Sequence, residues 1–462
     1  MHSVNSFARI SALAFGIAGV LAFGQAHGAA FQLKENSAKG LGRAFAGSGS
    51  APGDASVIAT NPAAMRHMKE TQFQADVSAI SFAADFKGGG RLPSFVTGPG
   101  TGAALTGGNG GDAGTIAAVP AMYFHTPIGE KLHLGASLTV PFGFKTEYDR
   151  DSVGRYHGVK TDLKTADLGL SLSYDVNPYV SFGAQVFVER LEVDLSNMVD
   201  LSTAVVSSAP AAQRPTLIGM GFVPGSADVY SQLEGSSNDW GFTVGGLFSV
   251  NEQTHLGLSY RSKVKHEITN GKAKFTATNT QATQGLALMA PRGVFVNTGG
   301  RATIELPASA TLSFTRQVND KLTIMADVSR TFWAPSFDAV TVDFASNQPN
   351  NVLPFRYRDT TFSSLGADYR LSDTLTLRGG VAYDQTPTTA EHRDVRVPDT
   401  SRKWLSLGLT WAPSEKAEYS FGYTHLFTTD PTVDQVSATG STLVGSYDVT
   451  GDVLGASINY KF

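Results

Sequence analysis

Apolar and polar residues alternate along much of the chain. In residues 168–176 the odd positions are small or polar, and the even positions are Leu168, Leu170, Leu172, Tyr174 and Val176. The same period of two recurs in residues 180–189, 256–263, 375–384 and 405–411. This pattern predicts strands with one apolar and one polar face, and the apolar face needs either a second sheet or lipid as its partner.

The connections between these strands distinguish the two partners. Six of them are short and turn-like, at residues 127–131, 177–178, 251–252, 319–320, 372–373 and 413–416. Seven long connections lie between them, at residues 87–112, 149–159, 197–228, 270–302, 345–357, 386–401 and 429–450. Thirteen alternating connections join fourteen strands. They predict an all-β fold, a 14-stranded antiparallel transmembrane β-barrel with tight turns at one end and long loops at the other.

The first 28 residues have the features of an export signal. Arg9 is the only Lys, Arg, Asp or Glu before Lys34, and residues 10–24 form an apolar run that is too short to span a bilayer as a helix. Ala26 and Gly28 stand at the −3 and −1 positions of a cleavage site. We therefore expect a signal peptide at 1–28 and a mature chain beginning at Ala29, with a buried N-terminal helix as the alternative.

Two further features argue against an open pore. Residues 29–70 precede the first strand, and their small and helix-forming residues predict a small helical hatch plugging the lumen of a barrel at 71–462. Pro141 interrupts an otherwise strand-like segment, and Gly143 follows it. Because proline cannot donate to a ladder, we expect a break in the third wall strand; a proline at the outer end of the strand is the alternative.

Composition narrows the function classes. Only 16% of residues are charged and none is cysteine, which excludes disulfide scaffolds, zinc fingers and cysteine nucleophiles. The net charge of -4 argues against a nucleic-acid partner. The ten histidines lack ligand spacing, and the common catalytic motifs are missing from the sequence. We expect no metal, no cofactor and no enzymatic activity, with an outer-membrane lipid hydrolase as a minor alternative.

Short motifs in order along the chain carry a resemblance. They include residues 29–33 (AAFQL), 40–47 (GLGRAFAG), 61–63 (NPA), 141–143 (PFG), 154–156 (GRY), 239–242 (DWGF) and 258–262 (LSYRS). Each is weak alone, but together they resemble the FadL/TodX family of outer-membrane long-chain fatty-acid and hydrocarbon transporters. The resemblance covers the mature chain from end to end.

This resemblance implies a transporter for hydrophobic compounds, namely long-chain fatty acids or aromatic or aliphatic hydrocarbons. The substrate would be captured between the two longest outer loops, pass to a site near the mature N-terminus, and leave sideways through a kink in the third strand. The Asn-Pro-Ala motif would lie beside that kink. Carried onto this sequence, the gate would be Ala29, Ala30 and Phe31, its support Asn61, Pro62 and Ala63, and the opening Pro141, Phe142 and Gly143.

The two longest outer connections, 197–228 and 270–302, hold apolar clusters of the kind that usually marks a binding surface. Flexible methionines suit contact with ligands of varied shape. Helices that pack only on one another are an equally weighted interpretation. The candidate capture groove consists of Met198, Leu217, Ile218, Met220, Phe222, Leu286, Leu288, Met289 and Phe295.

The family's fatty-acid members pair the ligand carboxylate with basic lumen residues. The candidates in this chain are Arg190, Arg261, Arg316, Arg330 and Arg378. Alternation assigns Arg261 and Arg378 to the lumen, whereas Arg190 falls among apolar positions. Arginines inside a barrel more often belong to structural charge ladders, so the choice between a fatty acid and an uncharged hydrocarbon stays open.

The last strand places terminal Phe462 on its apolar face. This resembles the assembly signal of bacterial outer-membrane barrels, which implies insertion by the barrel-assembly machinery into the outer membrane of a Gram-negative bacterium. We expect a monomer in contact with membrane lipid and lipopolysaccharide. A general porin or an adhesin is the alternative, and the predicted hatch argues against the porin.

Overall fold

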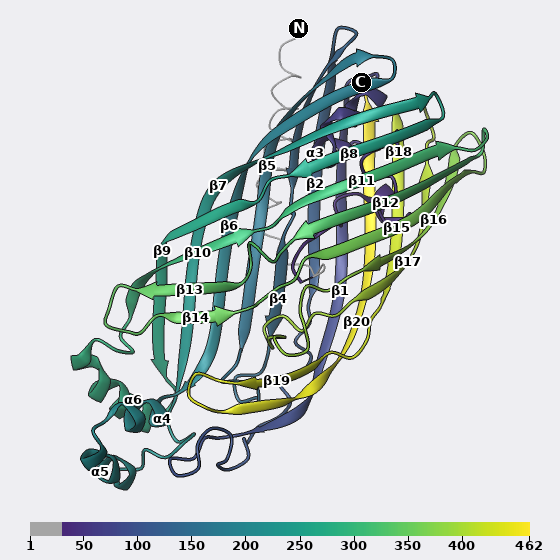
Figure 1. Cartoon of the computed structure of the whole chain (residues 1–462). Helices are drawn as coiled ribbons and strands as arrows, with labels where there is room; N and C mark the ends of the chain where they lie inside the picture. The colour runs from purple at the N-terminus through teal and green to yellow at the C-terminus, as the bar shows by residue number, and fades with distance from the viewer. Residues whose placement is uncertain (1–29) are drawn as a thin grey trace, which may run out of the picture.

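The computed structural model describes residues 30–462, so the predicted signal peptide and Ala29 lie outside the described residues. The described chain forms a closed antiparallel β-barrel (Figure 1). β1 pairs with both β2 and β20, and this pairing closes the wall. The fourteen predicted wall strands are confirmed.

Eight of the fourteen wall strands are continuous: β1 (Gln72–Arg91), β2 (Ile116–Ile128), β5 (Lys160–Asn177), β6 (Val180–Asp200), β7 (Asp228–Asn251), β16 (Leu375–Asp384), β17 (Arg402–Trp411) and β20 (Thr442–Lys461). Six are interrupted and consist of two segments each: β3 (Leu132–Thr139) with β4 (Gly143–Glu147), β8 (Thr254–Arg261) with β9 (Val264–Ala277), β10 (Thr298–Leu306) with β11 (Ala308–Gln317), β12 (Leu322–Phe332) with β13 (Ala339–Phe344), β14 (Asn351–Pro354) with β15 (Thr360–Arg370), and β18 (Ala417–Phe427) with β19 (Thr432–Val436).

The alternation in the sequence becomes an apolar exterior and a polar interior. Leu168 and Leu170 on β5 point outward and are 64% and 66% exposed, whereas Ser171 and Ser173 on the opposite face are buried. A water-soluble barrel would have the opposite arrangement, because its apolar side chains would fill the interior. The exposed apolar band is therefore a surface suited to lipid.

The wall is much taller on one side than on the other. β6 and β7 contain 21 and 24 residues, whereas β16 and β17 contain 10 each. β6 continues to Asp200 and therefore includes the first residues of the predicted connection at 197–228. Beyond the long strands lie the loop helices (Figure 1) α4 (Leu201–Ser208), η2 (Ala211–Gln213), α5 (Arg214–Gly219), α6 (Thr280–Met289) and η3 (Ala290–Arg292).

Residues 30–70 lie inside the barrel and form three short helices, α2 (Ala38–Leu41), α3 (Val57–Thr60) and η1 (Pro62–His67). Two of them, α2 and η1, begin with a side-chain cap. The Ser37 side chain accepts from the Gly40 backbone N–H, and the Asn61 side chain accepts from that of Ala63. No helix within residues 30–462 is long and apolar enough to cross a membrane.

Candidate functional site

The hatch approaches the wall most closely where the wall has inward-facing glycines. A Cβ atom on Gly245 would lie 2.0 Å from the Asn61 Oδ1 atom, and one on Gly183 would lie 2.4 Å from the Ala63 nitrogen. Only glycine permits such close approach. The Asn61 amide also donates to the Gly246 carbonyl at 3.2 Å. These contacts fix the hatch against β6 and β7.

The Asn-Pro-Ala motif contacts the wall at β6 and β7. Asn61 caps η1, Pro62 occupies the first turn of that helix, and the Ala63 carbonyl accepts from Ser181 on β6 at 2.8 Å. The motif packs on β6 and β7, and Ala59 and Thr60 directly before it line the same cavity as Pro141. Its role as the support of the gate stays a prediction. Capping ties it to the start of a helix, and the wall glycines determine where that helix fits.

A different part of the hatch reaches the break in the third wall strand. β3 ends at Thr139 and β4 begins at Gly143, with Pro141 between them. The Leu33 N–H donates to the Pro141 carbonyl at 2.8 Å, and the Gly143 N–H donates to the Phe31 carbonyl at 2.9 Å. Residues 30–33, called here the closing segment, thus provide partners for backbone groups that the interrupted ladder leaves unpaired.

Phe31 of the closing segment lies at the centre of an aromatic cluster. Its ring centroid is 4.8 Å from that of Trp333, 5.1 Å from Phe337 and 6.0 Å from Phe142. Tyr357 lies 6.4 Å away. Phe31, Phe142, Trp333, Phe337 and Tyr357, called here the aromatic cage, are almost completely buried. Edge-to-face pairs of this kind stabilise a cluster beyond simple burial of area.

Three neighbouring interruptions of the wall lie beside the cage, and two of them supply Trp333, Phe337 and Tyr357. β10 and β11 are separated by Pro307, β12 and β13 by residues 333–338, and β14 and β15 by residues 355–359. Within the second interruption, the Phe337 N–H donates to the Trp333 carbonyl at 2.8 Å. This local turn directs both rings inward. Sequence reasoning missed these residues, although proline near each interruption was an available signal.

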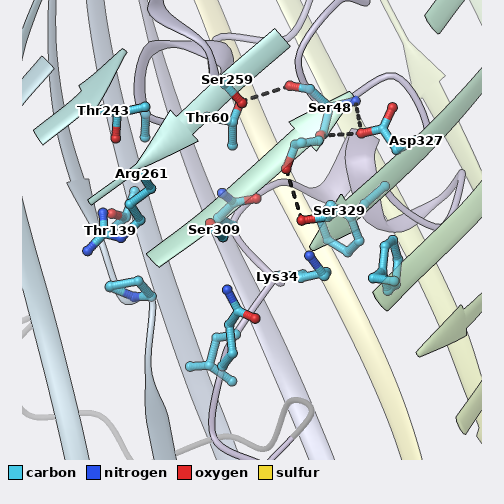
Figure 2. A pocket seen from close by; sticks show the side chains of 18 of the residues that line it. Lys34, Ser48, Thr60, Thr139, Thr243, Ser259, Arg261, Ser309, Asp327 and Ser329 are labelled. Atoms are coloured by element: carbon cyan, nitrogen blue, oxygen red, sulfur yellow. Dashed lines mark hydrogen bonds between the residues drawn. The ribbon is translucent and has the colours of Figure 1, made fainter. Parts of the chain in front are cut away.

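A cavity of about 130 Å³ adjoins the closing segment (Figure 2). Val140 and Pro141 line it at the break, Lys34 lines it from the hatch, and Arg261 and Asp327 line it from the wall. Serine and threonine hydroxyls cover much of the remaining surface (Figure 2). The cavity next to the break is therefore lined by hydroxyls and by apolar side chains such as Val140 and Phe142, whereas the cage itself is apolar.

Arg261 is the one predicted arginine that lines this cavity, and its charge is already matched. Its guanidinium forms ion pairs of 2.8 Å with both Asp167 and Glu189. It also lies 3.9 Å from the centroid of the Phe187 ring. An arginine held by two buried carboxylates is a structural element of the wall.

The hatch contributes its own charged groups to the cavity. Burial lowers the pKa of Lys34, while Asp384, Asp327 and Glu35 act in the opposite direction. The Lys34 ammonium lies 4.4 Å from the centroid of the Phe362 ring. Burial raises the pKa of Glu35 to about 7. Both residues follow the closing segment directly, so the seated position of that segment buries two ionisable groups.

Three of the five candidate arginines point away from the lumen, which corrects the prediction. Arg190 is exposed and pairs with Glu192 at 2.8 Å, and Arg330 is exposed and lies 3.5 Å from Asp359. Arg316 is also exposed. The alternation explains all three positions, because each shares its face with outward apolar residues. Arg378 does point inward, where its Nε lies 3.2 Å from an Asp368 oxygen.

The predicted capture residues divide into three groups. Met198 lies on β6 and is buried near the outer end of the wall, so it does not belong to a loop groove, because the strand continues to Asp200. Phe222 and Met289 are buried where α4 and α6 pack together, with Leu217, Leu286 and Phe295 partly buried around them. Ile218, Met220 and Leu288 remain exposed at 38%, 52% and 43%.

The fold and this site define a class, a plugged outer-membrane-type β-barrel with a buried aromatic cage and a small cavity in its lumen. Residues 19–462 match the model of a family described as outer membrane protein transport protein (OMPP1/FadL/TodX). The chain belongs to this family, whose members transport fatty acids and hydrocarbons across the outer membrane. It is accordingly an outer-membrane β-barrel of the Gram-negative type.

Individual relatives are similar over nearly their whole length. The chain is 31% identical to outer membrane protein P1 of Haemophilus influenzae, over 96% of this chain and 97% of the relative. It is 30% identical to the long-chain fatty acid transport protein of Escherichia coli K12, over 90% and 91%. A crystal structure of a Pseudomonas aeruginosa FadL homologue superposes with a TM-score of 0.84 at 26% identity, covering 94% of this chain and 99% of that one.

Proposed function

We propose that this barrel carries hydrophobic small molecules, long-chain fatty acids or hydrocarbons, through the outer membrane by lateral release. The ligand enters at the loop helices, binds against the aromatic cage, and leaves through the wall at Pro141 when the closing segment moves. One observation supports this most strongly: Phe31 is part of the cage, while its own carbonyl accepts a hydrogen bond from Gly143 across the break. Binding and closure therefore involve the same residue.

The closing segment is held in a way that is compatible with movement. Two backbone hydrogen bonds join it to the break, and each contributes roughly 1 kcal/mol net. A ligand that displaces the Phe31 ring from the cage would remove the packing that supports those bonds. A route opened in this way leads toward lipid, because the outward face of the wall is apolar.

Capture is assigned to the exposed part of the loop helices. Ile218, Met220 and Leu288 present apolar side chains to solvent beside a packed helical core. Replacing Leu288 with Asp should raise the KM for oleate uptake and leave the maximal rate unchanged, because the lumen site is intact. The matched control is Val96→Asp, which changes an apolar residue of the first loop that is 92% exposed.

Uptake by cells that express the protein tests the proposal as a whole. Saturable uptake of oleate, toluene or another hydrophobic compound is expected, and the proposal fails if every hydrophobic compound tried enters no faster than in cells without the protein. Planar bilayers separate this function from a general porin. A hatch-filled barrel should give no steady ion current, whereas a porin would conduct continuously.

The relatives with a stated role are transport proteins, and we propose no catalytic activity for this chain. Assembly is proposed to depend on the C-terminal strand. The Phe462 N–H donates to the Thr71 carbonyl at 2.9 Å, and its ring lies 5.3 Å from that of Tyr460 on the outer surface. Deleting Phe462 should reduce insertion into the membrane, and insertion at the normal level would exclude this role. A monomer in contact with lipid and lipopolysaccharide stays our prediction.

A further inference from the structure

A second, smaller cavity lies in the lumen wall between the aromatic cage and the loop helices. Its volume is about 50 Å³, and its lining is almost wholly apolar. The principal side chains are Val193 on β6, Leu233 on β7, Ile268 on β9, Ile304 on β10 and Val340 on β13. Five wall strands thus contribute apolar residues to one place.

This pocket connects two apolar regions that are otherwise separate. Ile268, Ile304 and Val340 pack in the same cluster as Phe31 and the rest of the aromatic cage. Leu233 packs instead against the cluster formed by the loop helices. A hydrophobic molecule that extends from the cage toward the outside therefore meets this pocket next.

The inward face of the same strands is polar closer to the hatch. Glu189 on β6 and Thr243 on β7 are buried and face the lumen, and His266 on β9 pairs with Glu189 at 2.9 Å. The change from polar to apolar lining occurs within single strands. Such a change is unexpected for a lumen filled only with water, and it suits a hydrocarbon ligand.

Glycines form the floor of the pocket. Gly271 pairs with Gly300 beside a bulge that puts two residues of β9 opposite Arg301. A Cβ on Gly271 would lie 2.7 Å from the Gly300 carbonyl oxygen, so a side chain does not fit there. Gly300 differs, because a Cβ there would meet no atom closer than 3.5 Å and its φ is not in the left-handed region.

Neither backbone geometry nor packing thus requires glycine at position 300. What the missing side chain preserves is the empty volume of the pocket. Residue 299, also glycine, is exposed and faces the opposite side of the wall. A Cβ on Gly299 would likewise fit, at 3.8 Å from the Gly271 carbonyl oxygen. Gly299 and Gly300 are therefore neighbouring positions on opposite faces of β10, and of the two only Gly300 lines the pocket.

We propose that the pocket at Gly300 binds the far end of an alkyl chain whose remainder lies against the aromatic cage. This inference rests on the proposed function and specifies its ligand: a long flexible chain occupies both subsites, whereas a compact aromatic hydrocarbon occupies the cage alone. Gly300 is then a residue that determines specificity for chain length.

Single-cysteine labelling tests the proposal directly, because the natural chain has no cysteine. The variants Gly300→Cys and Gly299→Cys are each purified and reacted with a maleimide in the presence of oleate or toluene. At ten times the Kd of oleate, labelling of the thiol at position 300 should slow by about tenfold, because only the unoccupied fraction reacts. Labelling at position 299 should not change, and toluene should protect neither thiol.

Each outcome has a distinct meaning. If oleate binds the wild-type protein but leaves labelling at position 300 unchanged, or slows labelling at both positions equally, the alkyl subsite is wrong and the proposed transport function stands. Protection of position 300 by toluene would contradict the chain-length role. Failure of the wild-type protein to bind or take up any hydrophobic compound would overturn the proposed function itself. A Gly300→Leu variant, with Gly299→Leu as its control, should lose oleate uptake while keeping toluene uptake.

Discussion

The wall of this barrel is interrupted in two regions, and the two are closed in different ways. At Pro141 the missing ladder partners are supplied by the closing segment, which belongs to the hatch and is joined to the break by two backbone hydrogen bonds. Across β10 to β15, the wall's own side chains fill the space, Trp333 and Phe337 among them. In the proposed function, the first closure opens and closes without changing the wall. The second is a permanent part of it.

This difference assigns a separate role to each region. We propose that the closure supplied by a separate segment has a second state, in which the segment leaves and the wall opens. A closure supplied by the wall residues has none, and it instead provides a fixed surface for a ligand. Phe31 contacts both regions, so in the proposed function it couples the fixed surface to the movable closure.

The largest effect is expected at the fixed region. Trp333 is fully buried in the aromatic cage, and truncating a buried tryptophan removes about 3–5 kcal/mol of packing. Trp333→Ala should weaken oleate binding by tenfold or more, since about 1.4 kcal/mol corresponds to tenfold in affinity. Equilibrium binding to the purified barrel measures this. Trp240→Ala is the control, because Trp240 is 70% exposed on the outside. If the two variants bind oleate with equal affinity, the aromatic cage does not contribute to oleate binding.

A smaller effect is expected at the movable closure and depends on pH. Burial raises the pKa of Glu35 from 4.5 to about 7 in the seated hatch. A released or unfolded hatch therefore loses this proton at lower pH than the seated one. The stability of the seated state falls as pH rises from about 4.5 to about 7 and then levels off. Each unit of difference between the pKa of Glu35 in the seated hatch and in the released hatch changes the equilibrium constant for seating by about tenfold.

Hydrogen exchange in the hatch, corrected for intrinsic rates, measures this change between pH 5 and pH 8. We expect weaker protection of α2 at pH 8 in the wild type and a smaller pH dependence in Glu35→Gln. The control variant is Glu391→Gln, which alters a carboxylate of an outer loop far along the chain from the hatch. Protection that does not change with pH in the wild type would show that the charge on Glu35 does not oppose seating.

The smallest effect is expected for arginines that belong to neither region. Arg190 and Arg330 lie on the outer surface with partly exposed acidic partners, and such pairs contribute about 0–1 kcal/mol. Arg190→Gln and Arg330→Gln should change the KM for oleate uptake by less than about twofold. A large rise in KM for either variant would mean that the ligand contacts the outer wall.

Much of the architecture could be predicted because a barrel depends on local repetition. The period of two identified the faces of β5, and the alternation of short and long connections gave the number and direction of the strands. Pro141 marked the third-strand break because proline has a single clear effect in a ladder. The strand ends were less predictable, since β6 and β7 continue through polar sequence once they leave the apolar band.

The site was less predictable, because its parts are brought together only by the closed barrel. Trp333, Phe337 and Tyr357 lie in interruptions where the alternation fails, so their direction was not evident from the pattern. Lys34 stands next to Glu35, and nothing local indicates that both are enclosed. The position of residues 61–63 depends on glycines of β6 and β7 far along the chain.

A reversible cross-link between the closing segment and the break tests the central claim most directly. Gln32 and Phe142 face each other across the pairing between them, in the close type of antiparallel pair whose geometry suits a disulfide. The double variant Gln32→Cys/Phe142→Cys has no other cysteine with which to pair. Oxidised, it should take up oleate at least about tenfold more slowly than after reduction, because the route would then need a covalent bond to break. Equal uptake by the oxidised and reduced forms would contradict lateral release at Pro141.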